Sequence, residues 1–188
     1  MVDLIGAYQV SLLTTMGISV ILALSLNLIT GFCGQISLGH AAFFGAGAYG
    51  SAMLTTAGWP FIVGLAAGTV VATLLGLLVG LASLRVRHDF LAITTMGVGF
   101  LFLGIVRQQE WLGGEMGISS IPDSGLGKGG YMVLVILIAT AIAVFSVHVK
   151  RSWMGYTFDA IADDEDTARM VGVDVARYKL VAFAMGTG

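Results

Sequence analysis

The chain has 188 residues, of which 57% are hydrophobic and 11% are charged, whereas a soluble domain carries about 25% charged residues. This small number of polar side chains cannot cover a water-facing surface. The sequence therefore predicts an all-α, polytopic membrane protein. The net charge of −2 is uninformative, because charge in such a protein matters by side of the membrane. The sequence has no basic patch with interleaved aromatic residues, so nucleic-acid binding has no support. The single cysteine, Cys33, can form no internal disulfide and suits no metal-binding set.

Apolar runs of about the length that crosses a bilayer, roughly 20 residues, occur five times. They lie at residues 7–30, 36–57, 61–84, 90–106 and 131–149, and a sixth begins near Lys179. We therefore predict about five complete spans plus the start of a sixth, in one membrane domain over residues 1–188. Because the sixth run, KLVAFAMGTG, is too short to span, we expect the chain to be a fragment truncated at its C-terminal end.

The segment GQISLGHAAFFGAGAYG, residues 34–50, covers the start of the second run. It is rich in small residues and favours either a continuous span or a broken, re-entrant helix. Gln35, Ser37 and His40 are its polar members, and Phe44 and Tyr49 are among its aromatic ones. Polar groups in lipid must face protein or water. Two roles stay open for the polar residues: hydrogen bonding between packed helices, or lining a pathway. Phe44 and Tyr49 are candidates for its apolar walls.

The third run carries a stripe of small residues at a spacing of four. Its members are Gly64, Gly68, Ala72, Gly76 and Gly80. On a helix they share one face, and small residues on such a face let a second helix approach closely. We predict that this stripe is a packing surface and not a substrate path.

Lys and Arg are distributed unequally between the two sides of the predicted membrane domain. The side with the loops after residues 84 and 149 holds Arg85, Arg87, Lys150, Arg151, Arg169, Arg177 and Lys179, and the other side holds Arg107 and Lys128. An excess of Lys and Arg marks the cytoplasmic side. We therefore predict that the N-terminus lies outside. No span interior contains Asp, Glu, Lys or Arg, which argues against a proton- or sodium-coupled carrier.

The segment GLGKGG, residues 125–130, has only a superficial likeness to a phosphate-binding loop. A P-loop needs Ser or Thr after its lysine and lies between a strand and a helix, whereas Lys128 is followed by Gly129. We therefore predict that this chain has no ATP site of its own.

The stretch after the fifth run, KRSWMGYTFDAIADDEDTARMVGVDVARYKL, is the longest polar segment of the chain. Its pattern predicts a short helix over 153–162, with Phe158 and Ile161 on one face. A second short helix fits 164–171 and would end at Gly172 in a left-handed cap. Such a compact pair of helices suits either a docking element or an ordinary amphipathic interfacial loop.

Acidic residues supply candidate caps for these helices. Asp163 with Asp166 gives an acidic capping pattern ahead of the second helix. Asp174 is placed to cap the helix that begins the sixth run.

The segment DTARMVGVDVARYKL resembles the cytoplasmic EAA loop of bacterial ABC-transporter permeases, in which Glu-Ala-Ala is followed by three residues and then Gly. Here the corresponding positions are Asp166, Thr167, Ala168 and Gly172. Three segments are similar, more specifically, to the permeases of the branched-chain amino-acid (leucine/isoleucine/valine) uptake family. They are DAIADDEDTARMVGVDVARYKLVAF, NLITGFCGQISLGHAAFFGAGAY and LRVRHDFLAITTMGVGF.

The resemblance implies that residues 150–178 form a coupling loop that inserts into a groove on an ATP-binding subunit. In that reading, Phe158, Ile161 and Ala168 would be the buried contacts. Asp164, Glu165 and Arg169 would form a polar rim around them. The chain would then be a transport subunit and not an enzyme, with no cofactor of its own and with ATP and magnesium on the partner subunits.

The implied assembly is an ATP-driven importer in the bacterial inner membrane. Its other parts would be a second permease subunit, two ATP-binding cassette subunits and an extracytoplasmic solute-binding protein. Membrane lipid would be a further partner of this chain. Close relatives in the family carry urea or short amides, so that substrate class is an alternative. An ion-coupled secondary carrier is a further alternative, with which the organised polar loop agrees less well.

Overall fold

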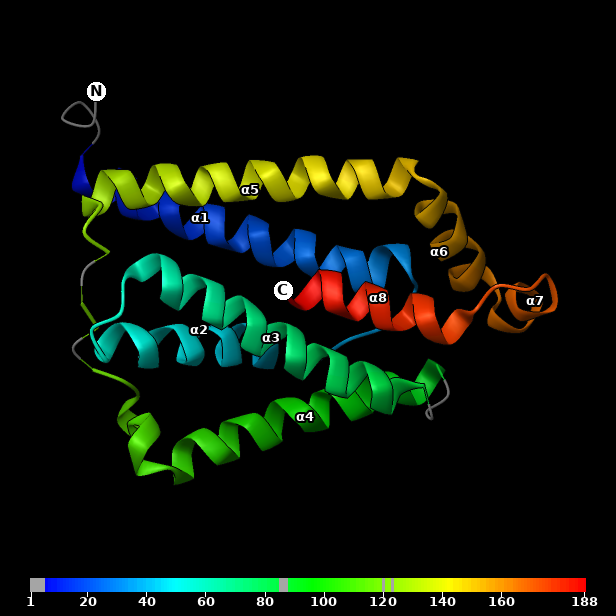
Figure 1. Cartoon of the computed structure of the whole chain (residues 1–188), viewed down its shortest axis with the longest axis horizontal. Helices are drawn as coiled ribbons and strands as arrows, with labels where there is room; N and C mark the ends of the chain where they lie inside the picture. The colour runs from blue at the N-terminus through cyan, green and yellow to red at the C-terminus, as the bar shows by residue number, and fades with distance from the viewer. Residues whose placement is uncertain (1–5, 85–87, 120, 123) are drawn as a thin grey trace.

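The computed structural model describes residues 6–84, 88–119, 121–122 and 124–188 of the chain. Within these residues all regular elements are helices and there is no strand, which confirms the all-α prediction (Figure 1). The long helices are α1 (Ala7–Leu26), continued by a π-helical turn (Asn27–Phe32), α2 (His40–Thr56), α3 (Phe61–Ser83), α4 (His88–Gln108) and α5 (Gly127–Arg151). The shorter ones are two 3₁₀ turns (Glu110–Leu112 and Gly114–Met116), α6 (Trp153–Asp163), α7 (Glu165–Met170) and α8 (Val175–Thr187).

Four stretches of helix in the described part of the chain are long and apolar enough to cross a membrane. They are Tyr8–Phe32, Phe61–Ser83, Phe90–Gln108 and Gly127–Arg151. With 23 residues, α3 extends about 35 Å at 1.5 Å per residue, enough for a hydrocarbon core of about 30 Å. Four of the five predicted spans therefore form helices of spanning length.

The second predicted span is a shorter helix that is preceded by a non-helical segment. Helix α2 has 17 residues and begins only at His40, so the broken alternative describes this run better than a continuous span. Gly34 has a φ of +70°, and its Cα packs against Ala162 of α6, where an added Cβ would lie only 3.0 Å away. A side chain is disfavoured there both by the backbone conformation and by the close approach of α6.

The helices run back and forth between two ends of the molecule (Figure 1). One end carries the start of α1, the turn between α2 and α3, and the segment between α4 and α5. The other end carries α6 and α7, and we call it the hairpin end. From there α8 returns into the bundle, so the C-terminus lies among the other helices.

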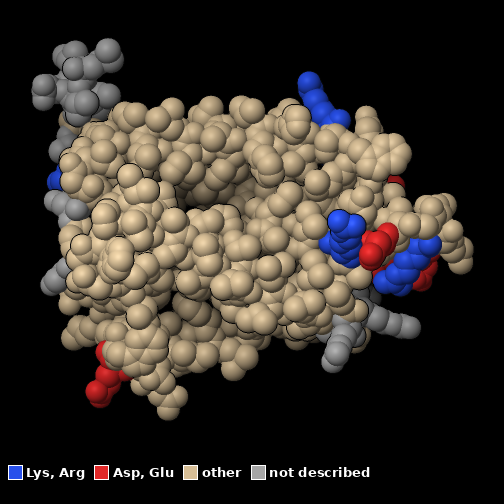
Figure 2. Space-filling model, in the orientation of Figure 1, with Lys and Arg blue, Asp and Glu red and all other residues tan. Residues whose placement is uncertain are grey.

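Charged residues gather toward the two ends, and the middle of the face in Figure 2 is free of them. The predicted cation asymmetry can be followed in the described residues. Lys150, Arg151, Arg169, Arg177 and Lys179 belong to elements at the hairpin end, and Arg107 and Lys128 to the opposite end. Arg85 and Arg87, which the orientation argument also used, lie outside the described residues.

The small-residue stripe of α3 is buried along its length, as predicted. A Cβ on Gly68 would lie 2.5 Å from the carbonyl oxygen of Gly47 in α2. A Cβ on Gly80 would lie 3.2 Å from the Cβ of Phe183 in α8. The stripe therefore packs α3 against two helices, α2 toward one end and α8 toward the other.

Buried apolar side chains form two clusters. We call the first the hairpin core, and it comprises Leu28, Phe32, Cys33, Val149, Phe158, Ile161, Ala168, Val175 and Ala182. We call the second the membrane core, and it comprises Ile29, Phe43, Val79, Leu91 and Phe183. The π-helical turn and α8 contribute to both cores, so these two elements connect the hairpin end to the interior of the bundle.

Candidate functional site

The α6–α7 hairpin, residues 153–170, starts with a sharp turn at the end of α5. Ser152 takes an extended conformation, with φ −85° and ψ 169°, and so stops α5. Its hydroxyl donates to the carbonyl oxygen of Val149 at 2.7 Å. Helix α6 then runs to Asp163, one residue beyond the predicted end.

Asp164 separates the two helices of the hairpin and caps the second one. Its Oδ1 accepts hydrogen bonds from the backbone N–H groups of Asp166 at 2.8 Å and Thr167 at 2.9 Å. These bonds, that of Thr167 first, hold the pKa of Asp164 below its ordinary value because they favour the charged carboxylate. The prediction that Asp163 takes part in the capping pattern is wrong, since Asp163 is the last residue of α6.

The end of α7 and the start of α8 are as predicted. Gly172 follows α7 with a φ of +89°, the left-handed conformation that ends many helices. The Oδ1 of Asp174 accepts a hydrogen bond from the backbone N–H of Arg177 at 3.1 Å, which confirms it as the cap of α8. The hairpin is therefore fixed at each of its turns by side-chain or glycine caps.

Three of the residues for which the resemblance implies partner contacts lie inside this chain. Phe158 is 0% exposed, Ile161 1% and Ala168 2%, and all three belong to the hairpin core. The ring of Phe158 meets Tyr178 of α8 edge to face, with centroids 6.0 Å apart. These side chains attach the hairpin to the ends of the long helices and to α8, and they are not free to contact another protein.

Other apolar side chains of the hairpin region point outward. Trp153 is 82% exposed and Tyr156 67%, and at the end of α7 Met170 is 87% and Val171 74% exposed. An amphipathic pattern identifies which face of a helix is apolar. It does not show whether that face is buried by other parts of the same chain or left open to a partner. Sequence reasoning therefore missed these four residues as the ones available to a partner.

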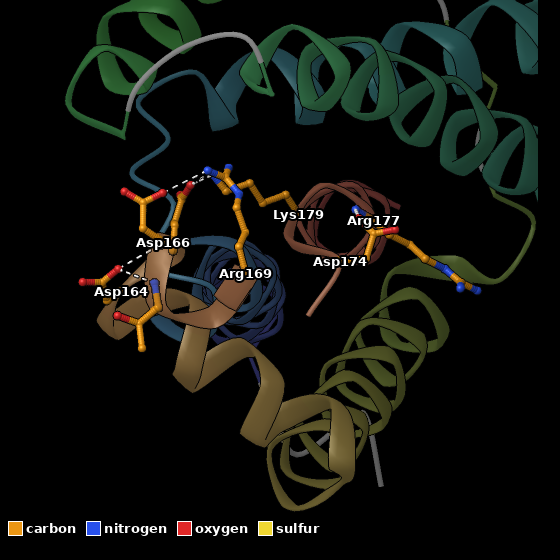
Figure 3. A network of polar contacts seen from close by, with 8 residues as sticks. Asp164, Asp166, Arg169, Asp174, Arg177 and Lys179 are labelled. Atoms are coloured by element: carbon orange, nitrogen blue, oxygen red, sulfur yellow. Dashed lines mark hydrogen bonds and ion pairs between the residues drawn. The ribbon is translucent and has the colours of Figure 1, made fainter. Parts of the chain in front are cut away.

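Ion pairs join the hairpin to its neighbours (Figure 3). Glu165 contacts Arg169 within α7, with Oε2 and Nη2 3.5 Å apart, and its Oε1 contacts the ammonium of Lys179 on α8. Asp166, whose side chain is 84% exposed, pairs with Arg169 at 3.1 Å. Figure 3 shows Arg169 and Lys179 reaching from different helices toward the same group of carboxylates. Lys179 entered the sequence analysis only as a cation near the start of the sixth run, and its partner could not be read from spacing.

The polar residues of the second run lie around the non-helical segment before α2. Gln35 is 0% exposed and Ser37 6%, and neither Gln35 amide atom nor the Ser37 hydroxyl has a hydrogen-bond partner among the described residues. His40 Nε2 lies 2.7 Å from the hydroxyl of Ser25 on α1. This hydrogen bond gives His40 a packing contact, while the pathway role of these residues stays a prediction.

The two aromatic candidates lie farther along α2. Phe44 is 50% exposed, in contrast to its neighbour Phe43, which is 1% exposed in the membrane core. Tyr49 packs edge to face on Phe102 of α4, with centroids 6.1 Å apart. The structure therefore spreads these predicted residues along one helix and its preceding segment and does not gather them at one point.

A cavity of about 400 Å³ opens at the end opposite the hairpin. It is lined by Ala48, Ser51, Ala52, Thr55, Phe61, Ile121, Pro122, Ser124, Gly127, Lys128 and Tyr131. Its walls come from α2, the start of α3, the residues just before α5 and the first turns of α5. No sequence pattern indicated that these segments meet. Among the described residues, no group of three His, Cys, Asp or Glu side chains is placed to hold a metal ion.

Comparisons with known proteins find relatives that are transport permeases. The chain is 30% identical to the high-affinity branched-chain amino acid transport system permease protein LivM of Salmonella typhimurium, over 94% of this chain and 49% of the relative. It is also 30% identical to the protein of the same name from Escherichia coli, over 96% of this chain and 49% of the relative. A probable branched-chain amino acid transport permease protein LivM of Methanocaldococcus jannaschii is 27% identical over 63% of this chain.

The chain thus spans about half the length of the two bacterial relatives. No solved structure gives a significant match. The profile of one family, described as the branched-chain amino acid transport system permease component, matches residues 8–188. With its apolar spanning helices and this match over nearly its whole length, the chain is a multi-pass membrane protein and belongs to the family of branched-chain amino acid transport system permease components.

Proposed function

We propose that the chain is part of a membrane-spanning permease subunit of an ATP-driven importer for branched-chain or related amino acids. The observation that carries this proposal is the capped α6–α7 hairpin at the cation-rich end of a bundle that belongs to a permease family. A hairpin whose turns are fixed by caps and whose inner face is packed in a core transmits displacement. A loosely attached loop would absorb it.

The hairpin end faces the cytoplasm in this proposal, and the start of α1 faces outside. The described residues of the hairpin end carry the larger share of Lys and Arg, which favours a cytoplasmic location. The membrane would be the inner membrane of a bacterial cell. The cavity at the opposite end would then open toward the side on which a solute-binding protein delivers substrate.

The coupling loop, residues 150–178, would seat the exposed side chains of Trp153, Tyr156 and Met170 in a groove of an ATP-binding subunit. The polar residues Asp166 and Arg169 would lie at the rim of that contact. Two such subunits would bind and hydrolyse ATP with magnesium, and a second permease subunit and a solute-binding protein would complete the assembly. This chain would supply the mechanical connection and part of the membrane path, and no catalytic residue.

Uptake measurements test this function. The full-length protein is expressed with its partner subunits in cells that lack branched-chain amino-acid uptake, and radiolabelled leucine is measured with and without excess isoleucine, valine, urea or acetamide. We expect leucine uptake that isoleucine and valine compete for, that stops when ATP is depleted and that survives collapse of the proton gradient. Competition by urea or acetamide alone would favour the amide alternative. Uptake abolished by an uncoupler while ATP is maintained would contradict an ATP-driven importer.

A further inference from the structure

We propose that Glu165 and Lys179 form a strut that carries movement of the α6–α7 hairpin into the membrane core, with Lys179 as a positioning residue. The inference rests on the proposed function, because it says how force applied to the hairpin would reach the helices. The strut is the ion pair between α7 and α8 described above.

The pair is shielded from water to a degree unusual for charged side chains. The side chain of Lys179 is 5% exposed and that of Glu165 is 21% exposed. Glu165 also contacts Arg169, so the charge that loses its compensation when the pair is broken is the buried ammonium of Lys179. A purely apolar contact tolerates sliding, whereas a buried pair has one register at which both charges are matched. The pair therefore fixes where α7 sits along α8.

The contacts of α8 continue from Lys179 into the bundle. Phe183 lies four residues after Lys179, so the two share one face of the helix. Phe183 is 0% exposed, and its ring meets that of Phe43 edge to face, with centroids 6.5 Å apart. From Glu165 to Lys179, Phe183 and then Phe43, each step is either a side-chain contact between different elements or one turn of α8. The last residue belongs to α2, the helix that follows the broken part of the second run.

Close packing along the same face of α8 limits its movement relative to the bundle. A Cβ added at Gly186 would approach the side chain of Ile29 and lie 2.9 Å from the carbonyl oxygen of Ser25. Gly80 of α3 meets Phe183 in the same way. Closely packed helices that shift do so together, so a displacement of Lys179 is passed on to its neighbours.

A second ion pair of the same hairpin provides a matched control. Lys150, in the last turn of α5, pairs with Asp159 of α6, and their side chains are 43% and 47% exposed. An exposed pair of this kind contributes little because water screens it and side-chain entropy opposes it. It joins the hairpin to α5 at the surface, whereas the strut joins it to α8 in the interior. Neither Lys150 nor Asp159 is among the side chains proposed to contact the ATP-binding subunit.

The test measures coupling and not only activity. The complete transporter is reconstituted in proteoliposomes with Lys179→Met, with Glu165→Gln and with the control Lys150→Met, and leucine uptake is divided by ATP hydrolysed. We expect the first two variants to hydrolyse ATP while uptake per ATP falls to a small fraction of the wild-type value. The control should match the wild type. Wild-type coupling in Lys179→Met would overturn the inference.

Two double variants separate the strut from a general requirement for folding. Glu165→Lys with Lys179→Glu keeps the charges in exchanged places and should regain part of the coupling. Glu165→Leu with Lys179→Met replaces the pair by apolar groups, which often preserves stability. It should assemble and hydrolyse ATP but remain uncoupled. An apolar double variant that couples like the wild type would contradict the role of the strut.

A readout that needs no substrate distinguishes failure of the inference from failure of the proposed function. If the wild-type complex takes up no leucine, the proposed function fails. The strut can still be tested by hydrogen exchange of α8 amides with and without bound nucleotide. We expect a nucleotide-dependent change in the wild type and in Lys150→Met, and none in Lys179→Met. An unaltered change in Lys179→Met would refute the strut even where transport is absent.

Discussion

Replacing Phe158 by alanine should detach the α6–α7 hairpin from the bundle. The side chain is 0% exposed at the centre of the hairpin core, and truncating a buried Phe to Ala costs about 3–5 kcal/mol. Part of that cost is the edge-to-face contact with Tyr178, a type of pair worth about 0.5–1.5 kcal/mol beyond its buried area. We expect the loss to be local, since the membrane core contains none of these side chains.

Hydrogen exchange followed by mass spectrometry measures this loss segment by segment. A destabilisation of about 3 kcal/mol corresponds to about 100-fold faster exchange of the hairpin amides, because each 1.4 kcal/mol is a factor of ten. Amides in α3 should keep their wild-type rates. Tyr156→Ala is the matched control on the same helix, since Tyr156 is 67% exposed and exposed substitutions usually change stability by less than about 0.5 kcal/mol.

The two variants should also separate stability from partner binding. Tyr156→Ala should leave hairpin exchange unchanged and weaken association with the ATP-binding subunit, because its side chain is available to a partner. If Phe158→Ala left the hairpin amides protected, or if Tyr156→Ala loosened them equally, the assignment of inner and outer faces would be refuted.

Three further predictions concern the cap, the packing stripe and the second run. The hydrogen bonds that lower the pKa of Asp164 stabilise the hairpin fully above the ordinary carboxyl pKa and less as pH falls through the lowered one. The protection of the hairpin amides, measured against the intrinsic exchange rate at each pH, should therefore fall on acidification below about pH 4, and Asp164→Asn should lose that dependence. Unchanged protection over this pH range would contradict the cap. Gly68→Leu should lower the thermal stability of the purified chain by about 1–3 kcal/mol or more through overpacking, while Gly97→Ala, where an added Cβ meets nothing within 4 Å, should be neutral or stabilising by up to about 1 kcal/mol. Equal melting temperatures for these two variants would count against the stripe. Phe44→Ala, at unchanged membrane expression, should alter leucine uptake if its half-exposed ring lines the path, and unchanged kinetics would exclude that role.

Sequence patterns were sufficient for the features that depend on local chemistry. Spanning helices follow from apolar length, and the stripe from Gly64 to Gly80 packs as its spacing predicts. Gly172 and Asp174 end and begin helices as their residue types suggest. Each of these features is decided within a few residues along the chain, so the sequence alone contains the necessary information.

Features that depend on distant contacts were missed or left open. Periodicity placed Phe158 and Ile161 on one face of α6, but the cover for that face comes from the π-helical turn, α5 and α8. The break before α2 depends on two distant contacts. Gly34 packs against Ala162 of α6, and the backbone N–H of Leu38 donates a hydrogen bond to the hydroxyl of Thr95 in α4. The partner of Lys179 lies 14 residues earlier in the chain, on another helix, where no helical spacing indicates a pair.

Site-directed crosslinking from Met170 tests the central claim most directly, namely that the exposed side of the hairpin contacts an ATP-binding subunit in the cytoplasm. The residue is 87% exposed, while the only natural cysteine of the chain, Cys33, is 0% exposed, so a cysteine introduced at position 170 would be the reactive one. We expect Met170→Cys to react with permeant thiol reagents only and to crosslink to the ATP-binding subunit, with Lys128→Cys at the opposite end reacting from outside and capturing no such subunit. Labelling of Met170→Cys by an impermeant reagent added outside intact cells would contradict the account.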